Sequence, residues 1–205
     1  MWQLYQHFRL EGRGIKDFEA FYEVYRDHNE KLWVRFRKGF IKREELRWKR
    51  MWHTLLDFKI GDTKIANELS AAYLEILPTQ KFLVQDALEV VAYCATKYKL
   101  HIITNGFDEV QYFKLENTGL KNYFHTVTTA EAANALKPNI RIFEYALHAI
   151  NAEAAQCMYI GDSPEVDGHG ALNAGMQFVW LNTEGRENKF NFRQIADLGE
   201  LITVL

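Results

Sequence analysis

Cysteine is scarce in this sequence, and the scarcity argues against two classes of protein. Only Cys94 and Cys157 occur among the 205 residues, which is thin material for a disulfide framework or a cysteine-based zinc site. We expect both to be small buried hydrophobic residues. The simplest interpretation is a reduced, cytoplasmic protein.

Long apolar runs and an excess of charge of one sign are also missing. No run reaches the length that spans a bilayer, and the first residues lack the basic and apolar regions of a secretory leader. The 25 Lys and Arg nearly balance the 27 Asp and Glu, giving a formal net charge of -2. This balance gives no reason to expect nucleic acid or an anionic membrane as a partner, so small soluble ligands are expected instead.

The first part of the chain, to about Pro78, has a helical pattern. Four aromatic residues lie at the spacing of one helix face, namely Phe18, Phe21, Tyr22 and Tyr25. Two more amphipathic stretches follow at 46–56 and 66–76, and Gly39 is expected to end the first helix. Because no strand pattern occurs, residues 1–78 are predicted to form a small helical cap domain.

After Pro78 the pattern changes to helices that alternate with short apolar strands. Strands are predicted at 100–103, 126–128, 158–160 and 178–181. Helices are predicted at 86–97, 108–118, 166–173 and 195–205, and a further helix is predicted to have Pro138 in its first turn. In the helix at 86–97 we expect four residues to be buried: Leu88, Val91, Ala92 and Ala95. The alternation predicts an α/β fold over residues 79–205, a Rossmann-like parallel sheet in a three-layer core.

Three polar clusters fall at positions where ligands bind in open parallel sheets. They are Thr104 with Asn105, Lys137 alone, and Asp162 with Asp167. A hydroxyl and backbone N–H groups suit the oxygens of a phosphate, and a lysine supplies a compact positive charge. Two close carboxylates repel each other unless a cation such as Mg²⁺ neutralises them. Together the clusters predict phosphoryl chemistry with a bound divalent cation.

The order and spacing of these clusters resemble the haloacid dehalogenase superfamily. Its second, third and fourth motifs are a strand-terminal Ser or Thr, a Lys, and an acidic pair after Gly. The most specific match is the segment 160–176, which reads IGDSPEVDGHGALNAGM. The similarity covers roughly the whole chain. Segments 102–107 and 136–138, with the strand that bears Trp180, look most like the bacterial pyrimidine nucleotidase branch.

The sequence departs from this superfamily at its start. Members begin with an apolar strand that ends in D-x-D, where the first Asp attacks phosphorus and the second is general acid and base. No such segment occurs here, because the early acids lie in helical patterns, at their edges or in a polar turn: Asp17, Asp27, Asp57 and Asp62. The resemblance implies that the chain starts inside the cap and lacks the first central strand with its nucleophile. A mis-assigned start codon, a shortened chain or a true pseudoenzyme would each explain this.

The resemblance implies a Mg²⁺-dependent phosphomonoester hydrolase that works through an aspartyl-phosphate on nucleoside monophosphates, as a monomer or homodimer. Asp162 is expected to ligate the metal directly, and Asp167 directly or through water. Thr104 and the backbone of Asn105 are expected to bind the phosphate. Lys137 is expected to neutralise developing charge and fix the nucleophile. The cap is expected to close over the site.

Three alternatives stay open. A sibling enzyme, either a 2-haloacid dehalogenase or a sugar phosphomutase, would share the scaffold, although dehalogenation needs no phosphate-neutralising cation. A pseudophosphatase would bind phosphorylated ligands without turning them over. A receiver-like signalling domain also places acids, a Thr and a Lys around Mg²⁺, but its acidic pair comes first in the chain.

The segment 35–50 interleaves Lys and Arg with aromatic residues, a combination that also occurs in nucleic-acid-binding proteins. At helical spacing, such a segment is typical of a solvated amphipathic face, and the balanced charge of the chain gives nucleic acid no support. We interpret it as a surface that attracts a phosphorylated substrate toward the cap.

Overall fold

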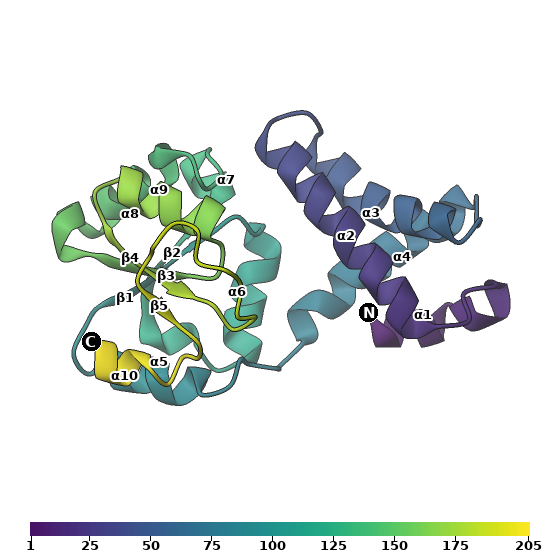
Figure 1. Cartoon of the computed structure of the whole chain (residues 1–205). Helices are drawn as coiled ribbons and strands as arrows, with labels where there is room; N and C mark the ends of the chain where they lie inside the picture. The colour runs from purple at the N-terminus through teal and green to yellow at the C-terminus, as the bar shows by residue number, and fades with distance from the viewer. The chain divides into compact units, whose positions relative to one another are not determined.

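The computed structural model describes residues 1–205 and divides the chain into two units, Met1–Pro78 and Thr79–Leu205 (Figure 1). The first unit contains helices only, as the sequence predicts, whereas the second combines helices with parallel strands. The α/β class predicted for the chain is therefore confirmed. No helix is long and apolar enough to cross a membrane.

The helical unit has a closed hydrophobic core. Its helices are α1 (Trp2–His7), α2 (Phe18–Arg37), α3 (Arg43–Asp57) and α4 (Thr63–Ile76). The core contains eight residues with at most 1% of their surface exposed: Leu4, Leu10, Ile15, Phe21, Met51, Leu55, Ala66 and Leu69. Gly39, just beyond the end of α2, has a φ of 73°, a conformation that glycine adopts readily.

The early acidic residues have structural roles in this helical unit. Asp17 caps α2 by accepting a hydrogen bond from the Glu19 backbone N–H at 2.9 Å. Asp62 caps α4 in the same way, with a 2.9 Å bond from the Lys64 N–H. Such caps satisfy backbone donors that a helix leaves unpaired at its first turn. Asp17 at the edge of α2, Asp27 within α2 and Asp57 at the end of α3 lie in helices or at their edges as expected. Asp62 follows the turn in which it was expected and caps the next helix.

The second unit places helices on both faces of its strands. Its elements are α5 (Ala87–Ala95), β1 (Leu100–Thr104), α6 (Asp108–Asn117), β2 (Phe124–Thr129), α7 (Ala130–Ala133), α8 (Ile140–Ile150), β3 (Met158–Gly161), α9 (His169–Asn173), β4 (Gln177–Leu181), β5 (Gln194–Ile195) and α10 (Leu201–Val204). Strand β1 pairs with β2, and β3, β4 and β5 form a separate group, all in parallel. Figure 1 shows α8 and α9 on one side of the strands and α5 and α10 on the other.

The side chains of β4 show how the layers are built. Phe178 and Trp180 pack with residues of α8 and α9, whereas Val179, between them, packs with residues of α5 and α10. Because side chains alternate between the two faces of a strand, a continuous apolar run is needed where helices cover both. The predicted strand at 178–181 has this composition.

The predicted helix at 195–205 is wrong. Ile195 belongs to strand β5 and pairs with Leu181 of β4, and it is only 1% exposed. The helix that follows is confined to α10, because Asp197 accepts a hydrogen bond from the Glu200 N–H at 3.1 Å and forms a turn first. The predicted helix therefore starts several residues too early in the sequence.

Two further details differ from the sequence prediction. In α5 the buried residues are Ala87, Val90 and Cys94, whereas Leu88 is 48% exposed. Apolar residues lie on nearly all sides of this short helix, so periodicity does not fix its buried face. Pro138 precedes α8 rather than lying in its first turn, because the side chain of Asn139 caps the helix.

Candidate active site

The loop that carries Lys137 is held against the end of strand β1. The Asn105 side chain accepts a hydrogen bond from the Lys137 backbone N–H at 2.7 Å and donates one to the Lys137 carbonyl at 3.1 Å. This pair of bonds fixes the position at which the lysine side chain leaves the loop. We expected only the backbone of Asn105 to act; its side chain has this positioning role.

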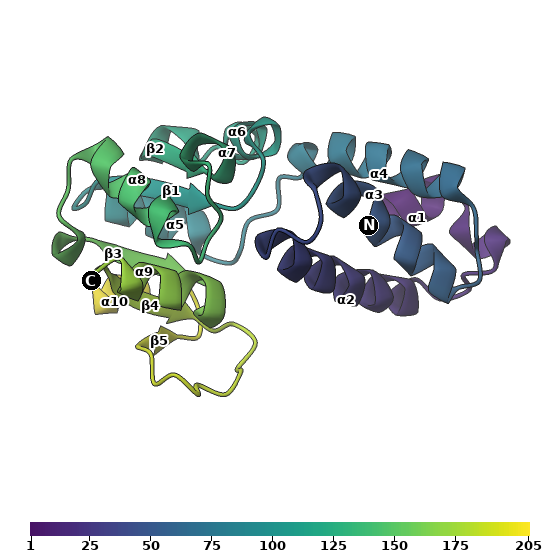
Figure 2. The ribbon, with the colours of Figure 1, turned by 90° about the horizontal axis from the view of Figure 1, so that it is seen from above.

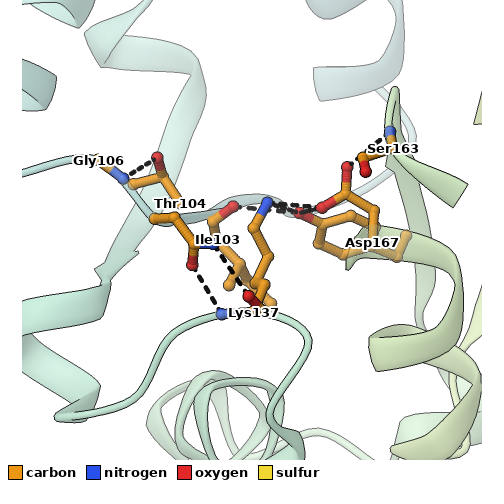
Figure 3. Close-up of polar contacts among 8 residues, drawn as sticks. Ile103, Thr104, Gly106, Lys137, Ser163 and Asp167 are labelled. Carbon is orange, nitrogen blue, oxygen red and sulfur yellow. Dashed lines mark hydrogen bonds and ion pairs between the residues drawn. The ribbon is translucent and has the colours of Figure 1, made fainter. Parts of the chain in front are cut away.

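The Lys137 ammonium group lies in a buried network. It donates hydrogen bonds to Asp167 Oδ1 at 2.7 Å and to the Tyr159 hydroxyl at 2.8 Å. The side chains of Lys137 and Asp167 are only 12% and 5% exposed. The Tyr159 hydroxyl in turn donates to the Ile103 carbonyl at 3.1 Å (Figure 3). Strands β1 and β3, the Lys137 loop and the turn after β3 therefore converge on one cation.

Asp167 is fixed through both of its carboxylate oxygens. While Oδ1 contacts Lys137, Oδ2 accepts the Ser163 backbone N–H at 3.1 Å. The side chain also rests directly on Gly161, where an added Cβ would lie 2.6 Å from the Cβ of Asp167. Only glycine leaves room for this contact, which gives a physical reason for the Gly before the acidic pair.

A second glycine lets helix α9 approach the Lys137 loop. A Cβ on Gly170 would lie 3.2 Å from the Cα of Pro138 and 2.3 Å from the ring of Phe143. The small residue therefore lets α9 pack closely against both the loop and α8. Gly170 of the sequence motif therefore has a packing role where α9 meets the Lys137 loop.

The network shifts two pKa values. Burial by itself would lower the pKa of Lys137, but Tyr159 and the Asp167 carboxylate act against it and raise the pKa above its usual value. Burial raises the pKa of Tyr159 to about 12. At neutral pH the lysine is therefore a cation and the tyrosine a neutral hydrogen-bond donor.

Thr104 and Asp162 lie at the ends of the two converging strands. The Thr104 hydroxyl oxygen accepts the Gly106 N–H at 2.9 Å, which forms a tight turn after β1. Asp162 follows β3 and is exposed to solvent. Its carbonyl accepts hydrogen bonds from Trp180 Nε1 at 3.2 Å and from Arg186 at 2.6 Å, so its backbone is held in place.

The structure thus brings Thr104, Asn105, Lys137 and Asp167 to one end of the strands, with Asp162 beside them at the end of β3. No group of three or more His, Cys, Asp or Glu is placed to hold a metal ion. Magnesium is commonly held by one or two carboxylates together with water and phosphate oxygens. Two carboxylates therefore fit Mg²⁺, whereas they are too few for a zinc site closed by protein ligands.

Sequence reasoning missed Tyr159 and Arg186. A signal for Tyr159 was present, because a tyrosine hydroxyl in an otherwise apolar buried strand needs a hydrogen-bond partner. Nothing in the sequence around Arg186 indicates its bond to Asp162, which depends on the loop that follows β4.

Comparison with known proteins places the chain in a family. Residues 54–181 match the model of the haloacid dehalogenase-like hydrolase family. The chain is 32% identical over 175 residues to the pyrimidine 5'-nucleotidase YjjG of Escherichia coli (strain K12), covering 84% of this chain and 73% of that protein. The chain is also 28% identical over 181 residues to the pyrimidine 5'-nucleotidase PynA of Streptococcus pneumoniae, and this match covers 87% of this chain and 76% of that protein.

The solved structures agree with this placement. The structure of the putative HAD-hydrolase YfnB from Bacillus subtilis, described as bound to magnesium, superposes with a TM-score of 0.87 at 25% identity. The superposition covers 99% of this chain and 90% of the YfnB chain. The chain is therefore a member of the haloacid dehalogenase-like hydrolase family, similar to pyrimidine 5'-nucleotidases and other phosphatases.

Proposed function

We propose that the chain carries the phosphate-binding and metal-binding residues of a Mg²⁺-dependent phosphomonoester hydrolase that acts on nucleoside monophosphates through an aspartyl-phosphate. The observation that carries the proposal is the buried Lys137 cation, fixed at the ends of β1 and β3 by Asn105 and Asp167. The similarity to two pyrimidine 5'-nucleotidases supports the choice of substrate class.

Each residue has a separate role in this proposal. The Thr104 hydroxyl and the backbone after it bind phosphate oxygens, and Lys137 neutralises the charge that develops on them. Asp162 holds Mg²⁺ directly, and Asp167 does so directly or through water while it orients Lys137. The metal supplies further charge neutralisation on the phosphate. The attacking carboxylate belongs to a strand that ends in D-x-D and that this sequence does not contain.

Calorimetric titration of the 205-residue chain with UMP, with and without Mg²⁺, tests these roles. We expect binding that requires Mg²⁺, is lost in Asp162→Asn, and persists in the control Glu165→Gln, which changes an exposed carboxylate of the same turn. Binding that is equally strong without Mg²⁺, or that survives Asp162→Asn, would contradict the metal assignment.

A turnover assay tests the missing nucleophile separately. We expect the 205-residue chain not to hydrolyse p-nitrophenyl phosphate, because none of the assigned residues supplies the attacking group. Robust hydrolysis that persists through stringent purification would show that another residue is the nucleophile. An in-frame apolar stretch ending in D-x-D in the DNA upstream of the Met1 codon would favour an enzyme over a pseudophosphatase.

A further inference from the structure

The carbonyl oxygen of Asp162 accepts two hydrogen bonds from side chains. Trp180 Nε1 of β4 donates one at 3.2 Å, and the Arg186 guanidinium, from the loop after β4, donates the other at 2.6 Å. A carbonyl oxygen has two lone pairs, so this acceptor is fully used. The bond from Arg186 is the stronger of the two, because a charged donor forms a shorter and stronger hydrogen bond.

Trp180 reaches Asp162 because of the strand register. It is the partner of Gly161 where β3 pairs with β4, and only 1% of its surface is exposed. Its ring is therefore fixed by the packing of the sheet. The Arg186 Cζ lies over this ring, 5.4 Å from its centroid and within range of a cation–π interaction. A buried ring thus supports the exposed arginine.

The loop that carries Arg186 has a closed first turn. Figure 2 shows the whole connection from β4 to β5 as a long loop. The Asn182 side chain accepts the Arg186 backbone N–H at 2.8 Å and donates to the Arg186 carbonyl at 2.8 Å. Asn182 is only 6% exposed, and its backbone N–H bonds to the Ile195 carbonyl of β5 at 2.8 Å. The Arg186 side chain therefore leaves the loop at a fixed position.

The peptide group between Asp162 and Ser163 is held at both ends. Its carbonyl accepts the bonds from Trp180 and Arg186. Its N–H belongs to Ser163 and donates to Asp167 Oδ2 at 3.1 Å (Figure 3). A donor at the carbonyl polarises the peptide and strengthens the bond that its N–H makes. One peptide group therefore connects Arg186 to both residues of the acidic pair.

We propose that Arg186 is a positioning residue for the acidic pair. By holding the peptide that follows Asp162, it fixes the Asp162 and Asp167 carboxylates relative to each other and raises their affinity for Mg²⁺. Mg²⁺ requires nearly ideal octahedral geometry, and groups that orient its ligands strongly affect its binding. The holding of the peptide rests on hydrogen bonds alone, whereas its effect on Mg²⁺ affinity rests on the proposed function.

The charge of Arg186 acts in the opposite direction. A guanidinium near a Mg²⁺ site repels the cation, so loss of the charge by itself would strengthen Mg²⁺ binding. This repulsion is weakened, because the Arg186 side chain is 46% exposed to water and its Nε lies 3.6 Å from Glu184 Oε2. Loss of positioning is therefore expected to outweigh relief of repulsion. Because the two effects differ in sign, a measured affinity distinguishes them.

Hydrogen exchange of the Ser163 amide without metal tests the holding of the peptide. Arg186→Met removes the charged donor and is expected to speed this exchange about tenfold, because the bond from Ser163 to Asp167 loses its support. The control is Lys189→Met, which removes an exposed cation of the same loop that pairs with Glu187 at 3.6 Å. This control is expected to leave the Ser163 amide unchanged. Unchanged exchange in Arg186→Met would overturn the proposal.

Titration of the 205-residue chain with Mg²⁺, followed by the NMR shifts of amides 161–168, tests the effect on the metal. Arg186→Met is expected to raise the dissociation constant about tenfold, and Lys189→Met to leave it unchanged. Arg186→Lys keeps the charge and one donor, so it should raise the constant by a smaller factor. Tighter Mg²⁺ binding by Arg186→Met would overturn the proposal, because the arginine would then act only as a repelling charge.

Two further outcomes are decisive. If Arg186→Met does not fold, Arg186→Lys decides, because a residue that acts only through its charge predicts an unchanged dissociation constant for this variant. If the unmodified chain shows no Mg²⁺-dependent shifts, the metal assignment of the proposed function is wrong and the claim about Mg²⁺ affinity fails with it. Faster exchange of the Ser163 amide in Arg186→Met would then still show that Arg186 holds the peptide.

Discussion

The helical unit and the α/β unit differ in how completely they bury their own elements. In residues 1–78 the core is closed, with Leu10, Leu55 and Leu69 fully buried. In residues 79–205, strands β1 and β3 remain half-buried along their whole length. A helix makes its backbone hydrogen bonds internally, whereas a strand depends on neighbours that come from distant parts of the chain. Helical segments therefore close a core locally, and a sheet does not.

The two units also differ in how they hold charge. In the helical unit Lys31 and Asp27 form an exposed ion pair one helical turn apart. In the α/β unit Lys137 and Asp167 form a buried pair from segments 30 residues apart. Exposed ion pairs contribute little to stability, whereas breaking a buried pair leaves one charge buried without a partner. The largest single effects are therefore expected at the site itself.

Removing the Lys137 charge should have the largest effect. Lys137→Met leaves Asp167 buried without its cation, which we expect to lower the unfolding free energy of the α/β unit by about 3–5 kcal/mol. Hydrogen exchange of β4 amides under increasing urea measures this. The control Lys121→Met removes an exposed pair with Glu116 and should cost less than about 1 kcal/mol. Equal costs for the two variants would show that the Lys137 pair is not buried in solution.

Truncating the closed core of the helical unit comes next. Leu55→Ala is expected to destabilise this unit by about 2–5 kcal/mol, because the side chain is fully buried and leaves a cavity. The adjacent Leu56 is 40% exposed, so Leu56→Ala should cost less than about 1 kcal/mol. Hydrogen exchange of α3 and α4 amides in urea gives the loss of unfolding free energy for each variant. Similar losses for Leu55→Ala and Leu56→Ala would argue against the closed core.

Loss of the Tyr159 hydroxyl should have a smaller effect. Tyr159→Phe removes one acceptor of Lys137 and the donor to the Ile103 carbonyl, which should cost about 1–3 kcal/mol. The control Tyr145→Phe alters a tyrosine of α8 that is 45% exposed. Urea titration followed by hydrogen exchange of the β3 amides distinguishes the two variants. An unchanged midpoint for Tyr159→Phe would show that the hydroxyl does not stabilise the network.

Alkaline pH should weaken the α/β unit gradually. The pKa values of Lys137 and Tyr159 are both raised in the folded state, that of Tyr159 to about 12. The folded protein therefore keeps these protons when the unfolded chain loses them. The stabilisation is complete below the unfolded values near pH 10 and is lost as pH rises through the folded values. The expected slope is at most about 1.4 kcal/mol per pH unit for each group.

A comparison of unfolding free energies between pH 9 and pH 12 measures this dependence. In Tyr159→Phe the tyrosine contribution disappears, so the slope between about pH 10 and pH 12 should become shallower. Stability that rises over this range would contradict the direction of both shifts.

The sequence predicted most of this architecture but not its long-range contacts. Strands β1 and β4 were found because apolar runs between helices are a local signal. Strand β5 was missed, since its two residues are defined only by pairing with β4. At the site, Thr104, Lys137 and Asp167 were placed by motif spacing. The Asn105 side-chain bonds and the role of Tyr159 come from contacts across 32 and 22 residues, which no local pattern encodes.

The most direct test of the contrast between the two units is native-state hydrogen exchange of the whole chain. Core amides of α3 and α4 are expected to exchange at least about 100-fold more slowly than the β1 and β3 amides that do not pair with β2 or β4. Equal protection of the two sets would contradict this expectation, because the edges of β1 and β3 would then be paired in solution.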